Sequence, residues 1–377
     1  MVRMHDIIPR GGSGPLPTSK RLAPKLATLA IALIVGIIGL ELALRLLGAG
    51  PLHVNPDQKS LWAHDSRLGW INHPGHVGTF DNGFFRVQVE INSKGLRGAE
   101  VGYQKPQGLK RILVVGDSFA WGFGVEQDEI FSTRLEAALP DTEVINAGVS
   151  GYSTDQALLW LQQEGKRYSP DVVIYLLSGN DDIMNSMQLA YWVYYKPSFQ
   201  LDRLGDLVLQ GVPVPEASFE NRARHFLRSR SAIAKAVEVA LQGHEASFVY
   251  LADSIPDPKN PHRLTVALVD AMRNEARSVG ASFLVVANAQ FWFSPNGSYE
   301  RLLVELRRAG GDVIDLIDVE SHPGWDADAM QIPGDGHWNG VGHAFVSGLV
   351  ADRLAAQGLD QPSAARGWSN AKPAASK

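Results

Sequence analysis

Short apolar runs that recur between amphipathic stretches constrain the fold of this chain more than any other feature. Runs of about 4–8 Val, Ile and Leu residues between turn signals are typical of strands buried on both faces. The stretches between them have helical spacing, as in the segment after Thr154, which places Ala157, Leu158 and Leu161 on one face. This alternation predicts an α/β fold with a parallel sheet covered by helices on both faces. The runs occupy residues 111–115, 142–146, 171–177, 281–287 and 312–319.

Small and polar residues follow the first three runs directly. Gly116-Asp117-Ser118 follows the first run, a turn that ends at Gly151 follows the second, and Asn180 follows the third. Open α/β sheets bind ligands outside the carboxyl ends of their strands. We therefore expect Ser118, Gly151 and Asn180 to meet at one edge of the sheet.

An acid and an imidazole lie two positions apart near the C-terminus, in the segment Asp335-Gly336-His337. A serine hydroxyl is a weak nucleophile at neutral pH and needs a base within hydrogen-bond reach. That base needs a carboxylate to orient it. If a loop brings this segment to the edge of the sheet, Ser118 is the nucleophile, His337 its base and Asp335 the orienting group.

A tetrahedral intermediate on Ser118 would also need hydrogen-bond donors for its oxyanion. Each such donor contributes about 3–4 kcal/mol. The backbone N–H groups of Ser118 and Gly151 and the side-chain amide of Asn180 are the candidates. Gly151 suits this role because a residue without Cβ lets a substrate approach the backbone closely.

Taken together, these motifs resemble the four conserved blocks of the SGNH (GDSL-like) hydrolases. The resemblance covers roughly residues 110–355 and implies a flavodoxin-like, doubly wound parallel sheet. It also implies an enzyme that cleaves or transfers acyl esters, with Ser118, His337 and Asp335 as the catalytic residues. Ser118, Gly151 and Asn180 would be its oxyanion donors. The four motifs are Gly116-Asp117-Ser118, Asn146-Ala147-Gly148-Val149-Ser150-Gly151, Gly179-Asn180-Asp181 and Asp335-Gly336-His337.

Two positions depart from the common pattern of that family. The family usually has three positions from Asp to His, whereas this chain has two, and Ser178 stands where many members have glycine. The Asp335-Gly336-His337-Trp338 segment is similar to one in SGNH-like O-acetyltransferases, which modify exported polysaccharides such as alginate. This similarity favours acyl groups on cell-envelope or secreted glycans as substrates.

An uncharged apolar segment runs from Leu26 to Leu40 and continues through Glu41 and Arg45 to Leu47. At about 1.5 Å per residue, roughly 20 helical residues span a hydrocarbon core about 30 Å thick. Basic residues precede the segment, so the positive-inside rule predicts a single-pass anchor in a bacterial-type inner (plasma) membrane. The N-terminus would be cytoplasmic and the catalytic domain periplasmic or extracellular. A cleaved signal peptide and a buried core helix are the alternatives.

The remaining segments lie before, between and after the apolar segment and the α/β domain, or are inserted into that domain. Residues 183–262 interrupt the alternation of strands and helices and are predicted to be an inserted cap at the rim of the sheet. The predicted parts are a cytoplasmic tail (1–25), the anchor (26–47), a β-rich lead-in (52–109) with an alternating strand at 85–91, the hydrolase-like domain (110–357) and a disordered tail (358–377).

Composition and isolated residues add less. The formal net charge of -5 does not suggest a nucleic-acid partner, and the absence of cysteine excludes thiolate chemistry. No cofactor or metal is expected. Trp121 and Trp338 flank the proposed site in sequence and are weak candidates for stacking on a sugar ring, with core packing as the alternative. His343 is expected to begin the last helix.

The leading hypothesis is a membrane-anchored serine esterase that acts on small or glycan-borne esters. The first alternative is a polysaccharide O-acyltransferase that forms the same acyl-enzyme. A non-catalytic envelope-assembly or glycan-binding protein with this fold is another alternative. The last is a metal-dependent phosphoesterase, with carboxylates at strand ends as metal ligands. Its ligands would come from Asp117, Asp181, Asp335, His337 and His343.

Overall fold

The predicted parallel sheet forms the centre of the molecule. Its strands are parallel and lie in the order β11-β10-β7-β5-β6. They are β5 (Lys110–Gly116), β6 (Thr142–Asn146), β7 (Val172–Ser178), β10 (Ser282–Asn288) and β11 (Asp312–Asp315). The computed structural model describes residues 19–47, 61–81, 84–179, 181–185, 194–220, 222–223, 231–234, 237, 262–288, 298–316 and 324–359.

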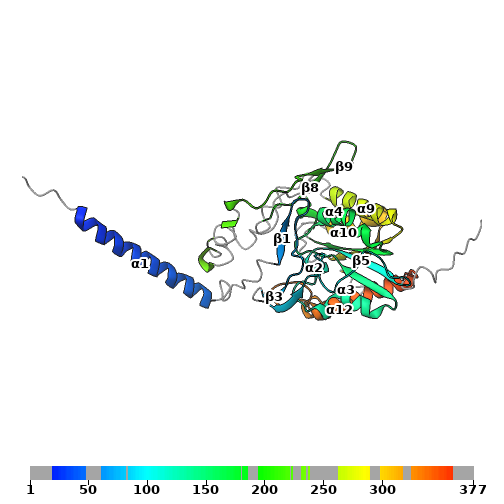
Figure 1. The fold of residues 1–377 in the computed structure, drawn as a ribbon, viewed down its shortest axis with the longest axis horizontal. Coiled ribbons are helices and arrows are strands. Elements are labelled where there is room, and N and C mark those ends of the chain that lie inside the picture. The colour runs from blue at the N-terminus through cyan, green and yellow to red at the C-terminus, as the bar shows by residue number, and fades with distance from the viewer. Residues whose placement is uncertain are drawn as a thin grey trace, which may run out of the picture.

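Helices cover both faces of this sheet (Figure 1). Alternate residues of β5 point to opposite cores: Leu113 and Val115 belong to one buried cluster, Ile112 and Val114 to the other. This double burial explains the unbroken apolar runs of the sequence. The covering helices are α3 (Phe131–Ala138) and α12 (Gly340–Ala356) on one face, and α4 (Thr154–Gln163), α9 (Arg263–Ser278) and α10 (Ser298–Arg308) on the other.

The segment that precedes the sheet forms two antiparallel hairpins. The first pairs β1 (Trp62–Asp65) with β2 (Gly69–Asn72), and the second pairs β3 (Val77–Asp81) with β4 (Arg86–Glu90). In β4 buried and exposed residues alternate, as the sequence pattern predicts for a half-buried strand.

Part of the predicted insertion is described. It begins in α5 (Asp181–Met184) and includes a hairpin of β8 (Ser198–Leu201) and β9 (Leu207–Gln210). This hairpin projects from the body of the molecule (Figure 1). Most of residues 221–261, which include the basic stretch of the insertion, lies outside the described residues.

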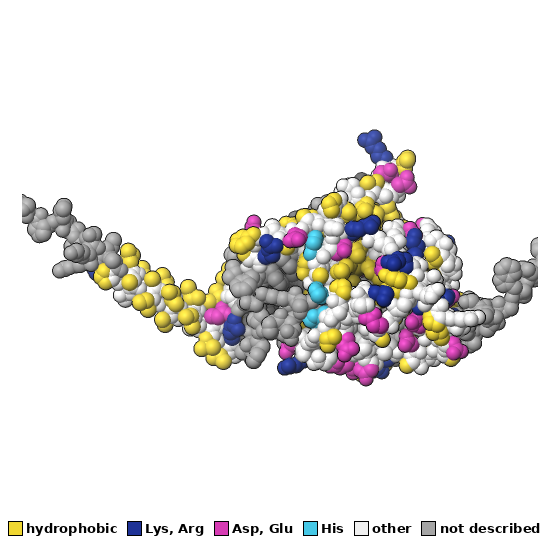
Figure 2. Space-filling view, viewed as in Figure 1, with side chains coloured by type: hydrophobic (Ala, Val, Ile, Leu, Met, Phe, Trp, Pro, Cys, Tyr) yellow, Lys and Arg dark blue, Asp and Glu magenta, His cyan; other side chains and the backbone are white. Residues whose placement is uncertain are grey.

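The N-terminal apolar segment is a single helix, α1 (Ser19–Leu46). Its part from Pro24 to Leu46 is long and apolar enough to cross a membrane, with a mean hydropathy of 2.4, and none of it is buried. Figure 2 shows hydrophobic side chains along its surface. The buried-core-helix alternative is therefore wrong, whereas an anchor and a signal sequence both fit such a helix.

Candidate active site

Ser118 lies at the point where the order of the strands reverses. The chain leaves β5 for β6 on one side and later returns to β7 on the other, which makes the carboxyl end of β5 the topological switch point. Ser118 is the first residue of α2 (Ser118–Trp121), and the Asp117 carboxylate caps this turn by accepting the N–H of Phe119 at 3.0 Å. Gly116 precedes it with φ +149°, and a Cβ there would lie 2.8 Å from the Leu176 carbonyl oxygen.

The loop that precedes α12, called the last loop below, brings His337 to this turn. Its Nε2 lies 2.8 Å from Ser118 Oγ, and its Nδ1 lies 2.6 Å from Oδ1 of Asp335. An ionised carboxylate only accepts, so we assign the proton of the neutral imidazole to Nδ1. Nε2 then accepts the hydrogen bond from the Ser118 hydroxyl. This is the arrangement that general-base activation of a serine requires.

Backbone hydrogen bonds and aromatic packing hold the imidazole in place. The N–H of Ile332 donates to the His337 carbonyl at 2.8 Å, which closes the loop at its base. Phe123 and Phe119 pack on the imidazole, with ring centroids at 4.3 and 4.8 Å. The side chains of His337 and Asp335 remain 14% and 10% exposed, so the site is held firmly and still reaches the surface.

The predicted oxyanion donors are described in part. Ser118 begins a helical turn, where N–H groups have no acceptor within the helix. Gly151 has φ +81°, a backbone conformation that favours glycine. Among the described residues no acceptor takes the Gly151 N–H. Asn180, the third predicted donor, lies outside the described residues.

The profile of the GDSL-like Lipase/Acylhydrolase family matches residues 114–345, well over half of the chain. The chain belongs to this family. An arylesterase from Vibrio mimicus is 32% identical over 81 residues, which are 20% of this chain and 40% of the arylesterase. The chain thus matches less than half the length of that relative.

Solved structures of a lipase/acylhydrolase and of an acetylxylan esterase are similar to this chain. A lipase/acylhydrolase from Enterococcus faecalis is 14% identical, with a TM-score of 0.37 over 66% of this chain and 97% of its own. An acetylxylan esterase from Geobacillus stearothermophilus is 11% identical, with a TM-score of 0.36 over 67% of this chain and 96% of its own.

Two buried carboxyl groups lie beneath the site of this GDSL-like protein. Asp181 accepts hydrogen bonds from the Tyr175 hydroxyl at 2.6 Å and the Ser178 N–H at 3.1 Å. Burial, and then the charge of Asp117, raise the pKa of Asp181 well above its usual value. Burial likewise raises the pKa of the Asp117 carboxyl. Through these hydrogen bonds, Asp117 stabilises the turn after β5 and Asp181 the turn after β7.

The two tryptophans predicted as weak sugar-stacking candidates are buried, which corrects that prediction. Trp121 and Trp338 are both 0% exposed. Trp121 packs on Phe123 and under the Arg97 guanidinium, and Trp338 packs against Phe119. Neither indole presents a face to a sugar, because Trp121 fills the core behind the turn at Ser118 and Trp338 fills the core behind the loop at His337.

The residues of the metal-centre alternative do not converge on one point. Nowhere in the described parts of the chain do three His, Asp or Glu side chains form a group that could hold a metal ion. His343 lies in the first turn of α12, which begins at Gly340 and not at His343 as predicted. It is 1% exposed, and its Nδ1 accepts the N–H of Phe131 at 3.3 Å. It packs behind Trp338 rather than beside His337.

The lead-in hairpin contributes residues that sequence reasoning did not connect with the site. Trp70 Nε1 donates to the Ser150 carbonyl at 2.9 Å, and Asn72 Nδ2 donates to the Gly148 carbonyl at 3.2 Å. Both acceptors belong to the turn that carries Gly151. No local signal could have revealed these contacts, because they join residues 80 and 76 positions apart.

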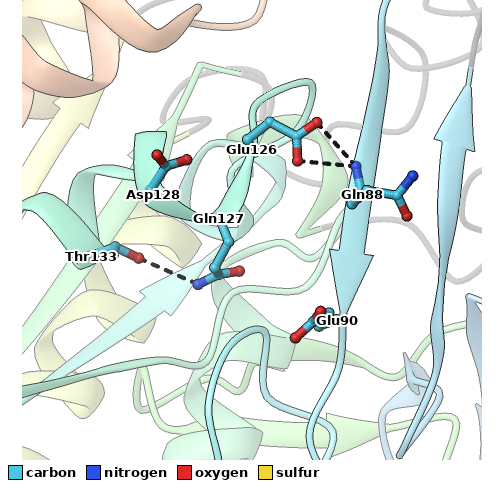
Figure 3. Close-up of a pocket in the computed structure, with 6 residues that line it drawn as sticks. All are labelled: Gln88, Glu90, Glu126, Gln127, Asp128 and Thr133. Carbon is cyan, nitrogen blue, oxygen red and sulfur yellow. Dashed lines mark hydrogen bonds between the residues drawn. The ribbon is translucent and has the colours of Figure 1, made fainter.

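A separate acidic hollow lies between the second hairpin and η2 (Gln127–Glu129). Figure 3 shows the Glu126 carboxylate accepting the backbone N–H of Gln88 across it. This bond fastens the hairpin to the body of the molecule. The hollow is lined by Gln88, Glu90, Glu126, Gln127, Asp128 and Thr133, and thus by none of the predicted catalytic residues.

Proposed function

We propose that this protein is a serine acyl-ester hydrolase in which Ser118 is the nucleophile, His337 the general base and Asp335 the group that orients it. The observation that carries the proposal is the continuous pair of hydrogen bonds, 2.8 Å from Ser118 Oγ to His337 Nε2 and 2.6 Å from His337 Nδ1 to Asp335. Membership of the GDSL-like family supports it independently.

In the first half of the reaction, Ser118 Oγ attacks the carbonyl carbon of the ester while its proton passes to His337 Nε2. Asp335 stabilises the imidazolium that forms. The oxyanion of the tetrahedral intermediate accepts hydrogen bonds from the N–H groups of Ser118 and Gly151 and from the Asn180 amide. The intermediate collapses when the alkoxide leaves with the proton from His337, and the acyl group remains on Ser118.

In the second half, His337 removes a proton from the acceptor, whose oxygen attacks the acyl-enzyme. Collapse of the second intermediate returns the proton from His337 to Ser118 Oγ. If the acceptor is water, the protein is an esterase, and if it is a glycan hydroxyl, it is an O-acyltransferase. Exclusion of water by the bound acceptor decides between these outcomes.

The proposed location is the outer face of a bacterial-type inner membrane. The apolar part of α1 has the length and hydropathy of a single-pass anchor, and the basic residues before it favour a cytoplasmic N-terminus. A domain tethered there meets envelope and exported glycans. Together with the similarity of the last motif to polysaccharide O-acetyltransferases, this favours acyl groups on glycans as substrates over free lipids.

Labelling with a fluorophosphonate tests the mechanism directly. The reagent should add to Ser118 in the wild-type protein and not in Ser118→Ala, with the adduct located by mass spectrometry of peptides. Asp128→Asn, in the acidic hollow, is a control that should label at the wild-type rate. Labelling at another residue, or undiminished labelling of Ser118→Ala, would overturn the serine mechanism.

An acetyl-donor assay with and without a glycan acceptor separates the two reaction types. A hydrolase should release acetate at the same rate in both cases. A transferase should form acetylated glycan and release less acetate when the acceptor is present.

A further inference from the structure

The β1–β2 hairpin of the lead-in holds the turn at Gly148–Tyr152, which carries the Gly151 N–H. The side chains that hold it are buried: Trp70 is 3% exposed and Asn72 1%. Both precede residue 114, so they lie outside the residues that match the GDSL-like family.

The Trp70 bond controls the direction of the Gly151 N–H through the geometry of one peptide group. The Ser150 carbonyl and the Gly151 N–H belong to the same planar trans peptide, so they point in opposite directions. Trp70 Nε1 holds that carbonyl at 2.9 Å. The Gly151 N–H must therefore point away from the hairpin.

The Trp70 ring also limits how far the turn can move. A Cβ built on Gly151 would lie 3.3 Å from Cζ2 of Trp70, so the ring packs directly on the glycine. In return, the Tyr152 hydroxyl donates to the Trp70 carbonyl at 2.6 Å. The hairpin and the turn are thus bonded in both directions, by the side chains of Trp70 and Tyr152.

Asn72 and the end of β5 hold the Gly148–Val149 peptide of the turn from its two sides. Its Nδ2 donates to the Gly148 carbonyl at 3.2 Å and to the Gly95 carbonyl at 3.0 Å. The Val149 N–H, at the other end of the Gly148–Val149 peptide, donates to the Gly116 carbonyl at 3.1 Å. A continuous series of hydrogen bonds therefore joins the hairpin, the turn that carries Gly151 and the end of β5. It reaches β5 at Gly116, two residues before Ser118.

We propose that Trp70 and Asn72 are positioning residues that aim the Gly151 N–H at the oxyanion, so that catalysis depends on a hairpin outside the residues that match the family. The inference rests on the proposed function, in which Gly151 is an oxyanion donor. Neither side chain touches the substrate. Each acts through a carbonyl of the turn.

Trp70→Phe tests the proposal in the full chain, because it keeps an aromatic ring and removes the Nε1–H donor. Loss of an oxyanion donor costs about 10²–10³ in rate, so misdirection of one should lower kcat by about 10-fold with KM little changed. A trifluoromethyl ketone, which forms a tetrahedral adduct on serine, should bind more weakly by a similar factor. Trp160→Phe is the matched control, since Trp160 stacks on Tyr168 away from the turn and should keep the wild-type kcat.

Hydrogen exchange of the 148–152 amides provides a readout that does not need activity. Exchange should be faster in Trp70→Phe and unchanged in Trp160→Phe. Equal kcat and equal exchange in the two variants would overturn the proposal. Should Trp70→Phe fail to fold, Asn72→Ser makes the same test. An inert wild-type protein that no fluorophosphonate labels would instead remove the proposed function, while the exchange result would still report on the hairpin.

Discussion

Two sets of side chains, one around His337 and one around His262, each combine an aspartate, a histidine and a hydroxyl, but in different orders. In the last loop, His337 lies between Asp335 and the Ser118 hydroxyl. At the start of α9, Asp182 lies in the middle, since it binds His262 Nδ1 at 2.8 Å and also accepts the hydroxyl of Thr265.

The order of the groups determines what each set can do. An imidazole between a carboxylate and a hydroxyl can take the hydroxyl proton, whereas a carboxylate that binds both groups only fastens them together. The two sets of side chains also differ in how deeply they are buried. The side chains of His262 and Asp182 are 3% and 4% exposed, against 14% and 10% for His337 and Asp335. The second set ties one end of the insertion to the turn after β7 and is structural.

The largest expected effect compares the two histidines. His337→Ala should lower kcat about 10⁶-fold, as loss of the base does in serine hydrolases, with little change in folding stability. His262→Ala should keep most of the activity of the folded molecules and destabilise the fold by about 1–3 kcal/mol, because Asp182 loses one of its two buried hydrogen-bond partners. Ester turnover and urea unfolding measure the two effects. A comparable loss of turnover in both variants would erase the distinction.

Substitution of Asp335 should likewise lower kcat more than substitution of Asp182. The difference in kcat should be smaller than between the two histidine variants. Asp335→Ala should lower kcat about 10⁴-fold, less than His337→Ala, because solvent replaces part of an orienting carboxylate. Asp182→Ala should act mainly on stability. The comparison is kcat per folded molecule, with the folded fraction taken from unfolding curves. If Asp182→Ala lost more turnover than Asp335→Ala, the roles assigned to the two sets would be reversed.

A third histidine, His343, should make the folding stability depend on pH. Burial, and then the charge of Arg97, lower the pKa of His343 from 6.5 to about 3. The unfolded chain takes up this proton near pH 6.5 and the folded protein does not, so stability falls as the pH drops from 6.5 toward 3. At pH 5 this loss is about 2 kcal/mol.

His343→Gln keeps an acceptor for the Phe131 N–H and removes the titration. Its stability should therefore fall less than that of the wild type between pH 7 and pH 5, as measured by urea unfolding at both values. The same fall in both proteins would mean that His343 is not held neutral.

Sequence reasoning predicted the sheet well because the signal is local. The run at 142–146 coincides with β6, and the segment after Thr154 with helical spacing coincides with α4. Both depend on the spacing of apolar residues within a few turns or pleats. The family match and the parallel sheet confirm the predicted fold class, while the roles of the site residues stay predictions.

The sequence alone failed where a side chain's role depends on distant neighbours. Trp121 follows Ser118 and Trp338 follows His337, which placed both near the site, but proximity in sequence does not tell which face of a turn is buried. Both indoles are in the core. Trp70 gave no functional signal, because its partner Ser150 lies 80 positions away.

By itself, then, the sequence determined where the strands of the central sheet form, which residue types can carry acyl chemistry, and that an apolar helix long enough to cross a membrane precedes them. Only the tertiary structure decided that the Ser118 hydroxyl and the His337 imidazole, 219 positions apart, lie 2.8 Å from each other. Only the tertiary structure, too, showed that the β1–β2 hairpin binds the turn that carries Gly151. Local patterns follow from backbone periodicity, whereas these contacts depend on how the whole chain returns to one edge of the sheet.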